Sequence, residues 1–339
     1  QKSTIPCLEG VLLRAGVALQ LTGYNLETGI TVHVGAQIQE AGSCVMPARL
    51  FFDIVRKLPD EMVSITVDHK QQVSIRAGAA FFQITAMDSE DYPELPDVNG
   101  KSGVTMPQSA LKSMISGTIF SVSENQARPI QTGCLMEVTE DSVTMVAVDS
   151  FRLARRTSHT ENAANHTLKF VVPAAGLKEI ERILEDSDEP VTFTLGDKHI
   201  LFSIGDALLV SRVLEGEFID WRRVVPTNCG TVLTANVAEL PSSTERVSLI
   251  ISEKVKSPVR CVFGDNMADF RTANTIGSAH DTCSIAGNGG ELEIGFNSRY
   301  LLDALRVIPS EEVTLELQNG LSPIVFTPCD KKYDFAYMV

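Results

Sequence analysis

Long hydrophobic runs are missing from this sequence of 339 residues. No apolar stretch approaches the roughly 18 residues that a membrane-spanning helix needs, and the opening residues, Gln1-Lys-Ser-Thr, do not resemble a signal peptide. Hydrophobic residues still make up 44% of the chain, enough for a core in each of two or three domains. We therefore expect a soluble, cytoplasmic protein of more than one domain.

Cysteine and histidine do not occur in the patterns that form disulfide frameworks or metal sites. The seven cysteines are scattered, odd in number and without a C-x-x-C, which favours reduced, mostly buried thiols. The six histidines show no metal-ligand spacing, and no G-x-S-x-G or phosphate-binding loop is present. Residues 287–290 lie between strand-like runs and predict a hairpin turn rather than a nucleotide fingerprint. We expect no catalytic residue, no cofactor and no metal.

Positive charge is scarce, because 29 Lys and Arg residues face 43 Asp and Glu residues and leave a formal net charge of −14. This balance argues against broad nucleic-acid binding, which normally needs a basic face. It leaves room for a small basic surface within an acidic molecule.

What the sequence does contain is a repeat. Three helix-like segments, 46–58, 172–184 and 296–308, have Pro47, Pro173 and Asn297 where a helix should begin. These positions lie 126 and 124 residues apart, and each segment continues with apolar residues at helical spacing and then a β-rich run. The sequence therefore predicts one structural unit repeated three times.

Further segments repeat in the same register. Residues 19–28 match 143–152, where an alternating strand pattern meets an acidic turn at Asp149, and residues 90–94 match 216–220. A helix candidate at 107–115 opens the second unit, and a weaker one at 234–251, with Pro241 in or near its first turn, opens the third. The first unit has no counterpart, so the pattern predicts a strand and a helix before Gln1. The expected domains are 1–102, 103–226 and 227–339.

At this point the sequence closely resembles one family, the bacterial DNA polymerase III beta subunit or beta sliding clamp. The resemblance spans nearly the whole chain, and its order and spacing are specific. It is carried by Ile5–Leu13, Asp91–Pro93, Arg128–Gly133, Ala147–Ala154, Leu214–Asp220, Ile294–Tyr300 and Ser322-Pro323.

The resemblance implies an α+β fold of three DNA-clamp modules, each with antiparallel sheets outside and two helices on the inner face. Two chains would join head to tail into a ring around duplex DNA. The implied function is that of a polymerase processivity factor, which is not an enzyme. An acidic protein suits this role, because a ring held by topology needs only weak, sequence-independent contacts with DNA.

The resemblance also implies a cleft between modules two and three that binds short linear peptides of the polymerase, the clamp loader and repair proteins. Its apolar residues would supply most of the binding energy, while Arg152 and Asn297 would orient polar groups of the peptide. The matching positions are Val148, Ser150, Phe151, Arg152, Leu153, Ile219, Arg223, Val224, Val255, Asn297, Tyr300, Leu321, Pro323, Tyr337 and Met338. Ser150-Phe151 stands where Gly-His is frequent in the family, and Ile219 where Pro is usual.

Two further surfaces follow from the resemblance. The basic residues expected to face DNA are Lys2, Arg49, Arg56, Lys112, Arg128, Lys178 and Arg182. The expected dimer interface pairs an edge strand around Phe82 and Ile84 with residues near Val247, Ile250 and Ile251. The alternative is a repeat-built scaffold that binds peptides without encircling DNA, which the net charge alone favours.

Overall fold

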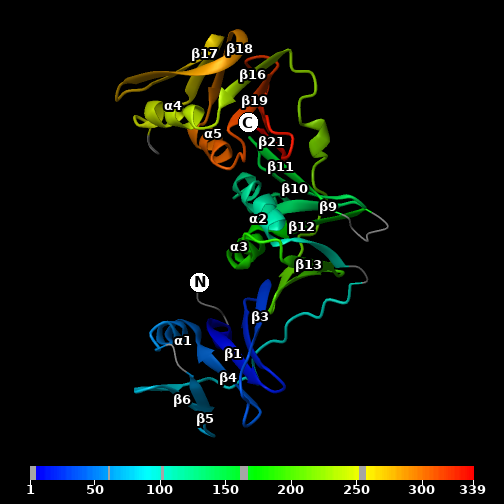
Figure 1. The fold of residues 1–339 in the computed structure, drawn as a ribbon, viewed down its shortest axis with the longest axis vertical. Coiled ribbons are helices and arrows are strands. Elements are labelled where there is room, and N and C mark those ends of the chain that lie inside the picture. The colour runs from blue at the N-terminus through cyan, green and yellow to red at the C-terminus, as the bar shows by residue number, and fades with distance from the viewer. Residues whose placement is uncertain (1–4, 60–61, 101–102, 161–166, 252–256) are drawn as a thin grey trace. The chain divides into compact units, whose positions relative to one another are not determined.

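The computed structural model describes residues 5–59, 62–100, 103–160, 167–251 and 257–339. The chain forms two compact units: unit 1 contains Gln1–Thr105 and Glu189–Arg212, and unit 2 contains Met106–Asp188 and Val213–Val339 (Figure 1). These units do not follow the expected repeats. Strands from the second repeat belong to unit 1 because β15 (Ala207–Arg212) pairs with β3 (Thr28–Val34), with Leu209 opposite Ile30.

Unit 1 contains an eight-stranded and a three-stranded sheet, with antiparallel pairing. The larger sheet has the order β4-β1-β2-β3-β15-β14-β13-β8, and the smaller has the order β5-β6-β7. The 3-10 helix η1 (Pro6–Glu9) precedes β1, and α1 (Ala48–Val55) packs on β1 and β4. The other strands are β1 (Gly10–Ala15), β2 (Leu19–Tyr24), β4 (Gly42–Pro47), β5 (Ser64–Val67), β6 (Gln72–Ala77), β7 (Ala80–Thr85), β8 (Gly103–Pro107), β13 (Pro190–Leu195) and β14 (His199–Ile204).

Unit 2 is built on one ten-stranded antiparallel sheet. Its order is β12-β9-β10-β11-β21-β20-β19-β16-β18-β17, so strands of the second and third repeats form a single sheet. The strands are β9 (Gly133–Val138), β10 (Ser142–Val148), β11 (Leu153–His159), β12 (Leu168–Pro173), β16 (Thr231–Asn236), β17 (Val259–Ala273), β18 (Ser278–Phe296), β19 (Glu312–Leu317), β20 (Val325–Pro328) and β21 (Asp334–Met338).

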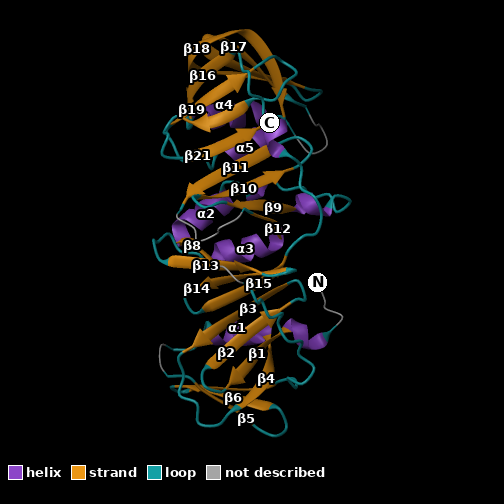
Figure 2. Cartoon of the chain, turned by 90° about the vertical axis from the view of Figure 1, so that its right-hand side faces the viewer, coloured by secondary structure: helices purple, strands orange, loops and turns teal. Residues whose placement is uncertain are grey.

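The α-helices of unit 2 lie behind this sheet when the strands face the viewer (Figure 2). They pack in pairs, α2 with α3 and α4 with α5, one pair for each repeat. The helices are α2 (Gln108–Ser116), α3 (Ala174–Ile183), α4 (Glu239–Ser248) and α5 (Ser298–Leu305), and the short 3-10 helices are η2 (Ile119–Ser121), η3 (Pro129–Thr132) and η4 (Trp221–Arg223). The expected two helices per repeat are thus present in the second and third repeats.

Helices begin at the predicted places, but the prolines lie at the N-cap and not at the first helical position that proline usually favours. Pro47 and Pro173 occupy the N-cap positions of α1 and α3, and Pro107 does so in α2. A proline has no N–H to satisfy, and its fixed φ admits the extended conformation of a cap. Asn297 caps α5 with its side chain, which accepts a 3.1 Å hydrogen bond from the backbone N–H of Arg299.

Two expectations about the third repeat were wrong. Residues 234–236, predicted as helix, end strand β16, and α4 begins only at Glu239, with Pro241 in its first turn. Residues 287–290 form no hairpin but lie inside the 19-residue strand β18, where Gly287 and Gly290 have positive φ and the register against β17 shifts. The residues linking β17 to β18 are 274–277 instead.

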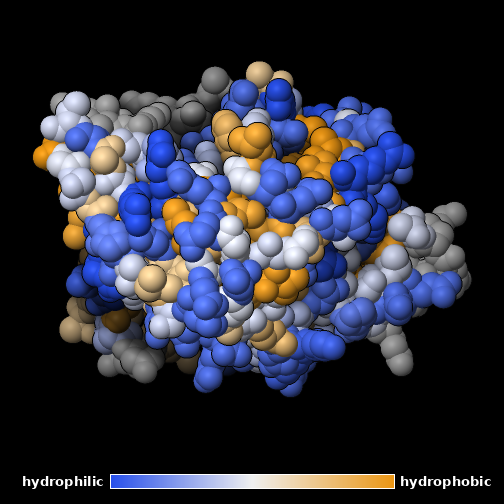
Figure 3. All heavy atoms as spheres, turned by 90° about the horizontal axis from the view of Figure 1, so that it is seen from above, coloured by the Kyte–Doolittle hydropathy of each residue, from blue (hydrophilic) through white to orange (hydrophobic). Residues whose placement is uncertain are grey.

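Each unit buries its own apolar core. In unit 1, α1 contributes Phe51 and Ile54 to a cluster with β1, β4 and β6. In unit 2, side chains from β16 to β21 and from α4 and α5 form a larger cluster that includes the fully buried Tyr337. The surface seen in Figure 3 is mainly hydrophilic with separate hydrophobic groups. In the described parts of the chain, no helix is long and apolar enough to span a membrane.

Candidate functional site

Strand pairing in unit 2 joins the second repeat to the end of the chain. β11 pairs with β10 on one side and with β21 on the other, so Leu153 lies opposite both Val148 and Met338. Three residues expected in one cleft are therefore neighbours in the sheet, although the chain separates Leu153 from Met338 by 185 positions.

The turn between β10 and β11 is held by Asp149. Its Oδ1 accepts hydrogen bonds from the backbone N–H groups of Phe151 and Arg152, at 2.7 and 3.0 Å. Asn25 and Asn274 form the same turn, with both bonds between 2.7 and 3.2 Å. The three residues lie 124 and 125 positions apart. Every repeat thus has this turn at the equivalent position, whereas the repeat pattern in the sequence had matched only the first two.

Arg152 is buried beneath this turn, with 7% of its surface exposed. Its Nε lies 3.0 Å from Asp149 Oδ2, and its terminal nitrogen Nη1 lies 2.8 Å from Asp303 Oδ2 on α5. The guanidinium also lies 4.3 Å from the ring centre of Tyr300 and 5.9 Å from that of Phe120. Burial alone would lower the pKa of Arg152, but the hydrogen bonds to Asp303 and Asp149 outweigh it and raise the pKa.

This placement bears on the role expected for Arg152. Two of its nitrogens already bind carboxylates of the same chain, so its contribution to a bound peptide would come through the residues it holds. Tyr337, also expected in the cleft wall, is fully buried and donates a 2.8 Å hydrogen bond to the carbonyl of Tyr300. Burial, the largest influence, raises the pKa of Tyr337 despite the opposing effect of Arg152.

A pair of aromatic side chains lies at the surface of the site. The Phe151 ring stacks on Tyr300 with 6.0 Å between ring centres and an angle of 28° between planes. Phe151 is 68% exposed, whereas Tyr300 is half-buried. A large exposed aromatic side chain is more typical of a binding surface than of a solvated loop.

Beside this pair lies an apolar group that we name the junction cluster. It combines buried residues of the second repeat with Val325 and Met338 of the third, and Ile219 packs against it. Its buried members are Leu135, Val146, Val148, Leu153, Val171, Trp221, Val325 and Met338. Trp221 and Val325 were not expected in the cleft, and neither was Ile130, which packs against the cluster and lies in the segment 128–133 that carried part of the resemblance.

A buried carboxylate anchors η4, the segment that leads from Ile219 to Val224. Glu137 on β9 binds Arg222 and Lys169, both at 2.8 Å, and only 5% of its side chain is exposed. The Arg222 guanidinium in turn lies 4.2 Å from the ring centre of Trp221. Burial would raise the pKa of Glu137, but the hydrogen bonds from Arg222 and Lys169 prevail and lower it.

Replacing Glu137 with Gln should therefore make the free energy of unfolding less dependent on pH. A carboxyl with a lowered folded-state pKa stabilises the chain above its unfolded-state pKa, about 4.3, and loses this effect as the pH falls through the folded value. At pH 7 we expect Glu137→Gln to lower the free energy of unfolding by about 1–3 kcal/mol. Urea titrations at pH 7 and below pH 4 should show that the difference in free energy of unfolding between the variant and the unmodified chain decreases as the pH falls. The exposed Glu124→Gln is the control, and a difference independent of pH would contradict this account.

The other residues expected in the cleft lie mostly on the surface. Arg223 is exposed and paired with Asp220 at 2.9 Å, and Val224 is 44% exposed. Asn297, Leu321 and Pro323 are exposed, Leu321 completely. Ser150 accepts a 3.3 Å hydrogen bond from Arg128. Val255 lies outside the described residues.

The residues expected to face DNA lie on helices or close to the turn. Arg49 on α1, Arg56 at the end of α1, and Lys178 and Arg182 on α3 are exposed, and Arg182 pairs with Glu179 at 2.6 Å. Lys112 on α2 pairs with Asp186 at 3.1 Å. Arg128 is exposed beside Ser150, and Lys2 lies outside the described residues.

The expected interface residues are accessible to different degrees. Phe82 and Ile84 lie on β7, an edge strand of the three-stranded sheet, and are partly buried against the core of unit 1. In unit 2, Ile250 and Ile251 are partly buried, and Val247 is 1% exposed inside the core. Leu249, which the sequence analysis did not select, is 83% exposed.

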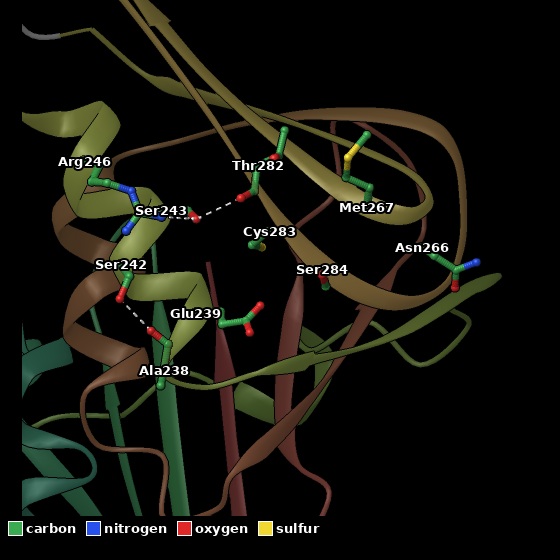
Figure 4. A pocket seen from close by; sticks show the side chains of 10 residues that line it. All are labelled: Ala238, Glu239, Ser242, Ser243, Arg246, Asn266, Met267, Thr282, Cys283 and Ser284. Atoms are coloured by element: carbon green, nitrogen blue, oxygen red, sulfur yellow. Dashed lines mark hydrogen bonds between the residues drawn. The ribbon is translucent and has the colours of Figure 1, made fainter.

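A separate hollow of about 590 Å³ lies between α4 and strands β17 and β18 (Figure 4). Hydroxyl, charged and amide groups form most of its lining, and Ser242 and Ser243 hydrogen-bond to backbone carbonyls. Burial raises the pKa of its single thiol, Cys283, to about 12, so that thiol is a poor nucleophile.

All seven cysteines are free, and five are buried. Among the described residues, no three His, Cys, Asp or Glu side chains are grouped to hold a metal.

Tandem β-rich repeats with paired helices, and an apolar surface where the second repeat meets the third, define the class of DNA-clamp proteins. Family models for the DNA polymerase III beta subunit match the chain in order: the N-terminal domain at 1–96, the central domain at 105–220 and the C-terminal domain at 222–338. The chain belongs to the family of the DNA polymerase III beta subunit, the beta sliding clamps.

Individual proteins agree with this assignment. The beta sliding clamp of Staphylococcus epidermidis is 30% identical over 340 residues, which cover 97% of this chain and 90% of that protein. The sliding clamp structure from Bacillus subtilis has a TM-score of 0.93 at 28% identity, covering 100% of this chain and 92% of the other. One from Pseudomonas aeruginosa bound to griselimycin has a TM-score of 0.93 at 29% identity, with the same coverage. The resemblance, the clamp fold and the non-catalytic role expected from the sequence are confirmed.

Proposed function

We propose that two copies of this chain close head to tail into a ring that encircles duplex DNA and tethers a DNA polymerase to it. The observation that carries this proposal is the succession of three matched clamp domains over almost the entire chain. The same matches support module boundaries near 1–102, 103–226 and 227–339. A cytoplasmic location follows from the replication role.

The partner cleft would lie over the junction cluster, with Phe151 and Tyr300 as its exposed aromatic wall. Support comes from the pairing of β11 with β21, which brings apolar residues of two repeats to one place. Polymerase, clamp-loader and repair proteins would insert a short peptide here. The wall includes Val148, Ser150, Arg152, Leu153, Ile219, Arg223, Val224, Val255, Asn297, Leu321, Pro323, Tyr337 and Met338. Tyr337 and Arg152 would act from beneath the surface, because both are buried.

Contacts with DNA would be few and independent of sequence. Arg49, Lys178 and Arg182 on helices and Arg56 at the end of α1 are exposed and would meet phosphates, and Lys2, Lys112 and Arg128 complete the set. The net charge of −14 would keep DNA from binding other faces. Weak contacts suit sliding, since tight phosphate binding would oppose it.

Retention on DNA should depend on topology. We expect protein loaded on nicked circular DNA to stay bound through gel filtration and to be lost once a restriction enzyme linearises the circle. Equal retention on both forms would favour the alternative, a peptide-binding scaffold that does not encircle DNA. Light scattering on the same sample should give a dimer, because a monomer could not close the ring.

A further inference from the structure

Arg152 is not required for a turn of this kind. Asn25 and Asn274 make the same side-chain hydrogen bonds as Asp149, and the residues at the position of Arg152 are Thr28 and Gly277. Two of the three turns thus form without an arginine. A buried guanidinium is costly to desolvate unless it is fully paired, so its presence in the second repeat needs another explanation.

The partner of Arg152 in the third repeat is Asp303. It lies three residues after Tyr300 on α5, so both side chains lie on neighbouring positions of one helix face. Asp303 Oδ2 is 2.8 Å from Arg152 Nη1, while the Tyr300 ring covers the guanidinium at 4.3 Å. The positions equivalent to Tyr300 in the other repeats hold Leu50 and Gly176, so of the three repeat helices only α5 places an aromatic ring there.

A chain of contacts therefore leads from the partly buried carboxylate of Asp303 to the aromatic wall. Asp303 binds Arg152, Arg152 lies against Tyr300, and Tyr300 stacks on Phe151. The backbone N–H of Phe151 is held as well, by a 2.7 Å hydrogen bond to Asp149. Phe151 is 68% exposed, so packing on Tyr300 is its main restraint.

We propose that Asp303 is a positioning residue of the partner cleft: it orients Tyr300 and Phe151 through Arg152 and so sets the affinity for the partner peptide. This inference rests on the proposed function. Its physical basis is pre-organisation, because an aromatic wall held in place before binding loses less conformational entropy when the peptide arrives. A purely stabilising ion pair would instead change the unfolding equilibrium and leave the affinity of folded protein unaltered.

The test uses griselimycin as the probe, since a related clamp binds it, and isothermal calorimetry of the full chain. Asp303→Asn keeps the size of the side chain but removes its charge, and we expect the dissociation constant to rise about tenfold. Asp303→Glu should recover most of the affinity. The matched control is Glu179→Gln on α3, which sits at the equivalent repeat position and pairs with the exposed Arg182. It should change the dissociation constant less than twofold.

Repeating the measurement in a Phe151→Ala variant shows whether Asp303 acts through the aromatic wall of the cleft. In chains that already carry Phe151→Ala, adding Asp303→Asn should weaken binding less than it does in the unmodified chain, because one of the two rings that Asp303 positions is gone. Equal weakening in both backgrounds, or no weakening in the unmodified one, would overturn the inference while the cleft itself stands. If the unmodified chain fails to bind griselimycin, the proposed cleft falls, and the inference falls with it.

Discussion

Replacing Arg152 with Met should lower the free energy of unfolding by about 3–5 kcal/mol, because it leaves two carboxylates without their shared cation. The side chains of Asp149 and Asp303 are 13% and 22% exposed, so water can solvate them only in part. Methionine fills much of the space of arginine, so that the loss reflects charge rather than a cavity. Urea unfolding at pH 7 measures the effect.

The matched control is Arg299→Met, which removes a second arginine near the same carboxylate. Arg299 lies 4.0 Å from Asp303 Oδ2, but 74% of its side chain is exposed. A surface pair of this kind contributes little, so we expect a change within about 0.5 kcal/mol. Adding Asp149→Asn and Asp303→Asn to Arg152→Met should restore part of the loss, since no uncompensated charge then remains. A loss below about 1 kcal/mol for Arg152→Met alone would show that water reaches these carboxylates.

The features that the sequence predicted well are local ones. Helix starts at Pro47, Pro173 and Asn297 follow from properties of single residues, and the strand after each helix follows from its alternating pattern. The repeat strengthens each prediction, because the same pattern at one helix supports the identification of the other two. Expectation and structure therefore agree best where the three repeats are most alike.

The site depends on contacts that the sequence could not show. The pairing of Leu153 with Met338 and the ion pair of Arg152 with Asp303 join residues at least 151 positions apart. Their positions could be carried over from the resemblance, but their roles could not. Thus Arg152, expected to contact the peptide, proves to be a buried member of an ion-pair network, and Asp303 was not selected at all.

The other differences between expectation and structure come from local details: which face of α4 is buried, and what the glycines at 287–290 do. Val247 and Leu249 are two positions apart at the end of α4, and helical geometry turns them to different sides, leaving them 1% and 83% exposed. The sequence pattern predicted a helix at 234–251 but did not show which of its faces is buried. At 287–290, glycines were interpreted as a turn, although Gly289 instead lets β18 approach the backbone of Phe263, where a Cβ would lie 2.3 Å from the carbonyl oxygen.

Leu249 yields the prediction with the largest effect on assembly. We expect Leu249→Asp to convert a dimer into a monomer in light scattering, because a charge on an exposed apolar residue costs nothing in the free chain but must be desolvated at an apolar interface. The backbone next to Leu249 is tied to the loop after β17, because the carbonyl of Ile250 accepts a 2.8 Å hydrogen bond from the side chain of Asn274. The same substitution should abolish retention on circular DNA.

Phe82→Asp, on the opposite side of the expected interface, should also give a monomer, but it is a less direct test. Phe82 packs against the core of unit 1, so the variant should lose stability as well as assembly. Leu249→Asp should lose only the stability that dimer formation adds, because Leu249 is exposed in the single chain. The control is Val17→Asp, which changes a fully exposed apolar residue between β1 and β2 and should leave the dimer intact. If Leu249→Asp stays dimeric while Phe82→Asp does not, the edge strand β7 meets a different part of the partner chain than the end of α4.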